Sequence, residues 1–222
     1  MELLAAAFAL GLAHGLEPDH LATVSVLVLR GAGARESALA GLRFGAAHVG
    51  VLLVAGAFAM LFNVVMTEEA AQAAEIVSGA VLFLLGLTCL FAPARADFIH
   101  AHTHVHGGSR HVHLHVHRDG EHHGHSHLSF ALGGLFAVGG ARSVLLVGLP
   151  AMNAGSVEGA ALAVGLFGLG IFLSMTLSGL VLARVARFLK GRGAPAFGWT
   201  RSVTGLLAAS IGGIWLVRSL VG

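Results

Sequence analysis

The sequence predicts an all-α integral membrane protein, with six transmembrane helices arranged as two inverted three-helix repeats. Of its 222 residues, 56% are hydrophobic, only 11% are charged and 32 are glycine, a composition that suits close helix packing in lipid. Six apolar segments approach the roughly 20 residues that a membrane-spanning helix needs. They are Leu3–Leu29, Ser37–Val65, Ala73–Phe91, Ser129–Pro150, Val157–Ala183 and Ser202–Val221. Helices are the expected spanning elements at this apolar length, because lipid cannot satisfy unpaired backbone groups.

The first segment contains the motif His-Gly-Leu-Glu-Pro-Asp-His at residues 14–20. Two imidazoles and two carboxylates are costly at membrane depth, and such groups usually belong to a pathway or binding site. In an unbroken helix, His14 and His20 would lie about 240° apart. The glycine and proline between them favour a break, which would turn both rings and Asp19 toward one point. Imidazole with carboxylate suits a borderline divalent ion such as nickel, cobalt or zinc. The alternative is a kinked helix whose histidines only bond neighbouring helices.

The second segment carries another intramembrane histidine, His48, with small residues on either side that allow close approach of the first helix. Its place on the helix that follows the motif favours a metal ligand over a hydrogen-bonding core histidine. On the fifth segment, Ser174, Thr176 and Ser178 either mark a polar path or bond back to their own helix.

The two halves of the chain resemble each other at a shift of roughly 122–126 positions. Phe-Ala-Leu-Gly at 8–11 recurs at 130–133, Phe-Gly at 44–45 recurs at 167–168, and Val-Ser-Gly at 77–79 is echoed by Val-Thr-Gly at 203–205. Because each half has an odd number of spans, the two repeats would have opposite orientations in the membrane. Many secondary transporters have this arrangement, with a site near the midplane. The alignment sets Arg142 opposite His20. Asp19 or Glu17 is the candidate counter-ion of Arg142. Alternatively, the Arg142 side chain extends toward the membrane interface.

A histidine-rich loop at 93–128 separates a first repeat at 1–92 from a second at 129–222 within one transmembrane domain, residues 1–222. Twelve of the 15 histidines lie here: His100, His102, His104, His106, His111, His113, His115, His117, His122, His123, His125 and His127. Such a tract binds metal by composition, with low specificity. Its alternation with valine and leucine also suits a short strand pair that turns at Gly107 and Gly108, and a disordered polar linker is the alternative.

Basic residues set the expected orientation. The first connection carries Arg30 and Arg35, the fifth carries Arg184, Arg187, Lys190, Arg192 and Arg201, and the second carries Glu68, Glu69 and Glu75. By the positive-inside rule, the first and fifth connections and the histidine-rich loop are cytoplasmic, and both termini lie outside.

These residues resemble a known family, the nickel/cobalt permeases, including their efflux branch. The motif at 14–20 looks like that family's H-x4-D-H signature, and Phe-Gly-Ala-Ala-His at 44–48 looks like the histidine motif of its next helix. The resemblance is best over residues 8–60. It implies a metal path made of His14, Asp19, His20 and His48, with Glu17 as a further candidate ligand. His-Gly-Leu-Glu-Pro and the long loop are similar to the efflux branch, whereas the aspartate before the last motif histidine is similar to the uptake branch.

The sequence therefore predicts a secondary transporter of Ni²⁺ or Co²⁺, with Zn²⁺ as another candidate, in the cytoplasmic membrane of a bacterium or archaeon. Uptake is favoured, because an inside-negative potential contributes about 2.3 kcal/mol per charge per 100 mV to inward movement of a cation. Efflux through the same site, and a membrane metal sensor or store acting through the loop, are the alternatives. The chain has no phosphate-binding loop and therefore does not hydrolyse ATP itself.

Other classes of protein fit the sequence poorly. The lone Cys89 excludes a thiol-disulfide electron carrier. The net charge of +2 reflects arginines that flank the membrane, so we expect no nucleic-acid partner. An intramembrane metalloenzyme would need a separate acid or base beside the motif, and the sequence offers none, so we expect no enzyme and no resident cofactor.

Overall fold

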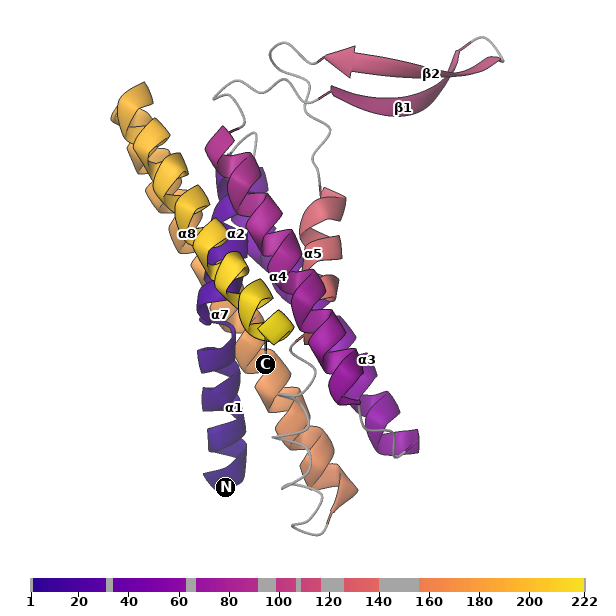
Figure 1. The fold of residues 1–222 in the computed structure, drawn as a ribbon. Helices are drawn as coiled ribbons and strands as arrows, with labels where there is room; N and C mark the ends of the chain where they lie inside the picture. The colour runs from indigo at the N-terminus through magenta and orange to yellow at the C-terminus, as the bar shows by residue number, and fades with distance from the viewer. Residues whose placement is uncertain are drawn as a thin grey trace.

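The computed structural model describes residues 2–30, 34–62, 67–91, 99–106, 109–116, 126–139 and 156–221. These residues form seven helices and one antiparallel strand pair (Figure 1). The helices are α1 (Glu2–His14), α2 (Pro18–Arg30), α3 (Ala34–Phe62), α4 (Glu68–Phe91), α5 (Ser126–Gly139), α7 (Val157–Gly191) and α8 (Ala194–Val221), and the strands are β1 (Ile99–His106) and β2 (Ser109–Val116). Among the described residues, α3, α4, α7 and α8 contain segments long and apolar enough to cross a membrane.

The first apolar segment is split into two half-helices, α1 and α2, of 13 residues each. Each half is about 20 Å long, so the break lies at the middle of the first apolar segment. Within the break, the Leu16 and Glu17 amides donate to the carbonyls of Ala13 and His14, three residues back instead of four. This tighter turn ends α1, and Pro18, which has no N–H to donate, begins α2. The predicted break is confirmed.

Helix α7 runs on to Gly191, whereas the apolar pattern ended the fifth segment at Ala183. The extension carries Arg184, Arg187 and Lys190, which were expected in the fifth connection. Arginine and lysine are good helix formers, and their long side chains reach water from a continuing helix. The expected end of this segment is wrong for that reason.

Helix α8 begins at Ala194, not at Ser202. Gly193 separates it from α7 with a φ of 105°, a conformation that glycine adopts without strain. Arg201 therefore lies within α8 and not in a connection. Its Nε donates to the Cys89 carbonyl of α4 at 2.9 Å, which ties the two helices together.

Only the beginning of the fourth predicted segment, in α5, lies in the described part of the chain. The glycine-rich break expected after Gly139, and Arg142 with its proposed counter-ion, lie outside the described residues. Those expectations stay predictions.

The helices approach one another closely at glycines. α4 packs along α8, α3 packs along α7 and α5, and α1 packs along α7. A methyl group added at Gly41 would clash with the backbone of Gly179, where α3 meets α7. Small residues at such crossings let two backbones touch, which is how membrane helices gain dispersion contacts without a hydrophobic driving force.

The contacts of α1 and α5 are reciprocal. Gly11 of α1 abuts the backbone of Phe167 on α7, and Gly133 of α5 abuts the backbone of Phe44 on α3. The sequence repeat aligns residue 11 with residue 133 and residue 44 with residue 167. Exchanging the two halves therefore exchanges the two contacts.

The α4–α8 pair has the same property. Gly79 lies against Gly212, and Gly86 lies against Gly205. The repeat aligns residue 79 with residue 205, and the same shift carries residue 86 to residue 212. Exchanging the halves converts one glycine contact into the other.

Strands β1 and β2 form a hairpin that projects beyond one end of the helical bundle (Figure 1). The strand pair that the alternating pattern allowed is confirmed. Its register sets His100 opposite His115, His102 opposite His113 and His104 opposite His111. Residues directly opposite in an antiparallel pair belong to the same face of the ribbon. His127 begins α5 with Ser126, and His117, His122, His123 and His125 lie outside the described residues.

Candidate metal site

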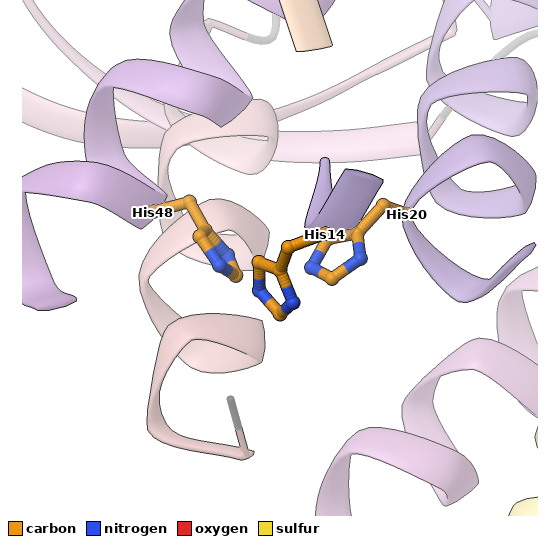
Figure 2. Close-up of side chains that lie close together, drawn as sticks. All are labelled: His14, His20 and His48. Atoms are coloured by element: carbon orange, nitrogen blue, oxygen red, sulfur yellow. The ribbon is translucent and has the colours of Figure 1, made fainter. Parts of the chain in front are cut away.

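Three imidazoles meet at the break between α1 and α2 (Figure 2). His14 ends α1, His20 lies in the first turn of α2, and His48 comes from α3. The ring centroids lie 4.9 Å apart for His14 and His20, 4.8 Å for His20 and His48, and 5.6 Å for His14 and His48. One nitrogen from each ring lies within 4.8 Å of the other two. The arrangement places three nitrogen ligands around one point.

The three rings are buried, and five of their six nitrogens lack a hydrogen-bond partner among the described residues. His14 is 7% exposed, His20 2% and His48 0%. Among the described residues, His14 Nε2 and both nitrogens of His20 and of His48 have no partner. An unpaired buried polar group costs about 1–3 kcal/mol, so nearly all such groups in proteins are paired. Unpaired nitrogens gathered at one point are the expected state of a metal site built from neutral imidazoles.

Two carboxylates adjoin the rings. Asp19 Oδ1 lies 3.2 Å from His20 Nδ1, although the geometry is not that of a hydrogen bond. Glu17 bridges the break, with Oε1 3.1 Å from His14 Nδ1 and Oε2 4.0 Å from His20 Nδ1. Glu17, Asp19 and His20 also form a second group whose ligand atoms lie within 4.8 Å of one another. The five candidate ligands therefore lie close together: His14, Glu17, Asp19, His20 and His48.

The ends of the two half-helices set the local electrostatics. The N-terminus of α2 carries a partial positive charge, which stabilises the Asp19 carboxylate in its first turn. The C-terminus of α1, at His14, presents partial negative charge to the same region. Thr23 Oγ1 donates to the Asp19 carbonyl at 2.8 Å, and the side chains of both residues are buried. A cation at the break would therefore be attracted by the α1 C-terminus and by the carboxylates, while the α2 N-terminus keeps Asp19 ionised.

Helix α7 forms a wall against the break. A methyl group at Gly15 would clash with the Ser174 hydroxyl and lie 3.0 Å from the Ile171 carbonyl, so only glycine allows this approach. Ser174 Oγ donates to the Ile171 carbonyl at 3.0 Å, within its own helix. Back-bonding, one of the two alternatives for this serine, is therefore confirmed. The buried Thr176 hydroxyl has no partner among the described residues.

Three phenylalanines, Phe44, Phe136 and Phe167, pack beside the imidazoles. None of them was predicted as a site residue. The ring centroid of Phe136, from α5, lies 6.5 Å from His20 and 6.1 Å from Phe44. The ring centroid of Phe167, from α7, lies 5.8 Å from His14. All three phenylalanines are at most 3% exposed. The carboxylates and the aromatic rings therefore give the three imidazoles both charged and apolar neighbours.

The internal repeat contained a signal for this aromatic wall. Its shifts align Phe136 with His14 and Ile171 with His48. Both aligned residues are buried beside the site, as the histidines are. The second half thus places apolar side chains where the first half places ligands.

Comparison with known proteins finds a partial likeness. The chain is 28% identical over 102 residues to the urease accessory protein UreH of Bacillus sp. (strain TB-90). The match covers 46% of this chain and 44% of that protein, so it spans less than half of the relative's length. No family model and no solved structure matches the chain.

Proposed function

We propose that the chain is a secondary transporter of divalent transition-metal ions, Ni²⁺ or Co²⁺, across the cytoplasmic membrane, with uptake as the favoured direction. The observation that carries the proposal is the group of three buried imidazoles at a helix break, five of whose six nitrogens have no hydrogen-bond partner among the described residues. Nitrogen ligands suit nickel, cobalt and zinc and disfavour magnesium and calcium. The likeness to a urease accessory protein is consistent with a nickel-related membrane protein.

Charge balance supports a dication as the cargo. Imidazoles supply no negative charge, and an unpaired dication in a low dielectric is costly. Asp19 and Glu17 place two carboxylates beside the rings. The site therefore combines nitrogen ligands, which select the metal, with nearby charge that compensates it.

The membrane potential is the proposed energy source for uptake. An inside-negative potential contributes about 2.3 kcal/mol per charge per 100 mV, and a dication carries two charges. Efflux through the same site is the alternative direction, and it requires coupling to another ion.

We extend the proposal to the architecture: six spans in two inverted repeats, with both termini outside and the histidine hairpin in the cytoplasm. The reciprocal glycine contacts of α1 with α7, of α5 with α3, and of α4 with α8 support a two-fold relation between the halves. In such transporters one repeat rocks against the other around a fixed site. The contact between Phe44 and Phe136 joins elements of different repeats, and both rings lie beside His20, so opening this contact would give a path to the site.

The histidine hairpin has a supporting role in this proposal. Its register brings histidines opposite one another in three successive pairs, a pattern that favours collecting metal near the membrane. A sensor or store acting through the hairpin is the second candidate function. It leaves the buried imidazoles without a role, because a membrane anchor needs no ligands.

Flux into proteoliposomes tests the proposal. Vesicles containing the full chain and a trapped nickel-sensitive dye should show Ni²⁺ influx that rises with an imposed inside-negative potential. Replacing His48 with alanine should abolish this flux, and Mg²⁺ should not enter. Flux that persists unchanged in His48→Ala, or no flux from correctly folded wild-type protein, would contradict the proposal.

A further inference from the structure

The two groups of candidate ligands overlap in one residue. His14, His20 and His48 form the inner group, and Glu17, Asp19 and His20 form the outer group. His20 Nδ1 is the nitrogen that lies 3.2 Å from Asp19 and 4.0 Å from Glu17. His20 Nε2, across the same ring, is buried and without a partner among the described residues. One imidazole is therefore placed to serve both groups.

The candidate ligands of the outer group include one that is exposed, whereas those of the inner group are all buried. Glu17 is 47% exposed, whereas Asp19 is 3% exposed and His48 is fully buried. An ionised carboxylate half exposed in the middle of a span needs water or a cation around it, because lipid would penalise its charge. Glu17 consequently marks the open side of the site.

The two groups also differ in chemistry. The outer group has two carboxylates, which attract any divalent cation and exchange it readily. The inner group has three neutral imidazoles, which retain nickel, cobalt or zinc more strongly than hard cations. Glu17 additionally contacts His14 Nδ1 at 3.1 Å, so its carboxylate touches both groups.

We infer that the chain binds its cargo in two positions that are filled in turn and share His20, and that Glu17 loads the inner position. The ion first binds Glu17, Asp19 and His20 and then exchanges the Glu17 carboxylate for the imidazoles of His14 and His48. This inference rests on the proposed function, and it assigns Glu17 to the rate of loading more than to the final affinity.

Rapid mixing of Co²⁺ with the full chain in lipid nanodiscs tests the inference through the visible absorption of bound cobalt. The signal that His48→Ala removes reports the inner position. Glu17→Gln should load this position about tenfold more slowly or worse, because it removes the charge that concentrates the cation. Its equilibrium affinity for Co²⁺ should fall by a smaller factor than its loading rate, since that variant retains all three imidazoles and Asp19. Glu158→Gln, which alters an exposed carboxylate at the start of α7, should load at the wild-type rate.

Competition by Mg²⁺ gives a second, independent readout. Mg²⁺ should slow Co²⁺ loading of the wild type, because the outer carboxylates accept hard cations, and should have a much smaller effect on Glu17→Gln. A wild-type loading rate in Glu17→Gln would overturn the inference and leave the proposed function standing. A wild type with no His48-dependent cobalt signal would instead overturn the proposed function itself.

Discussion

Asp19 is the buried carboxylate nearest the three imidazoles, with Oδ1 3.2 Å from His20 Nδ1. A carboxylate beside a metal-binding imidazole fixes the ring and raises its basicity as a ligand. It also supplies charge that a dication needs in a low dielectric. In the proposed transporter, Asp19 therefore strengthens metal binding through its charge and its contact with His20.

Replacing Asp19 with asparagine should preserve the fold and reduce transport. The substitution retains size and one oxygen but removes the negative charge, so nickel affinity and flux should fall by about 10–100-fold. Flux in proteoliposomes and the thermal unfolding of the same preparation measure the two effects separately. Wild-type flux in Asp19→Asn would exclude this carboxylate from the mechanism.

Much of the site was predictable at this scale, because the chemistry is local. The ionisable residues at 14–20, with a glycine and a proline among them, predicted both a break and a meeting of His14 with His20. The place of Phe136 was not predictable in this way. It reaches the site from the second half of the chain through the packing of α5 on α3, which no local pattern encodes.

At the scale of elements, the break depends on how closely α7 can approach it. Gly15 leaves room for the Ser174 hydroxyl and the Ile171 carbonyl, and any Cβ would force these atoms away. We therefore expect the close contact of α7 with Gly15 to stabilise the turn that brings His14 and His20 together.

Gly15→Ala should lower stability by about 1–3 kcal/mol, the usual cost of overpacking, and weaken nickel binding as well. Gly50→Ala is the matched control, because no atom of the described residues lies within 4 Å of a methyl group at that helical position. The control should be neutral or stabilised by up to about 1 kcal/mol, since alanine favours a helix over glycine. Unfolding curves and metal titrations check both variants, and equal behaviour of the two would contradict this role of Gly15.

The histidine hairpin is the element whose removal separates the two candidate functions. Excising residues 99–125 removes β1 and β2 and leaves α5, which begins at Ser126. We expect metal recruitment at low nickel concentration to weaken, while flux at saturating nickel stays measurable, because the buried ligands are intact. Complete loss of flux from a well-folded deletion variant would place the hairpin within the transport pathway.

The apolar pattern located the helices more accurately than their ends. It stopped the fifth segment at Ala183, because hydrophobicity falls where Arg184 and Arg187 begin. The helix continues to Gly191 since these residues favour helix and can extend into water. Hydropathy reports where lipid lies, whereas backbone propensity and Gly193 decide where the helix stops.

At the scale of the whole molecule, the proposed inverted repeat makes a quantitative prediction. Gly11→Ala and Gly133→Ala would each force a methyl group against the backbone of an equivalent phenylalanine, Phe167 or Phe44. Both should therefore cost a similar amount, about 1–3 kcal/mol. Gly165→Ala should not destabilise the protein, because its new methyl group meets no atom within 4 Å in the described part of the chain. Chemical unfolding in one detergent measures all three, and a costly change at one repeat with a neutral change at the other would argue against the symmetry.

The central claim is that three buried imidazoles bind the transported ion. X-ray absorption at the nickel or cobalt edge tests it most directly, on protein that lacks residues 99–125 and is loaded with one equivalent of metal. The account predicts a shell containing nitrogen from the three imidazoles of His14, His20 and His48, and the loss of one imidazole in His48→Ala. A shell made only of oxygen ligands, or an imidazole count that His48→Ala leaves unchanged, would contradict it.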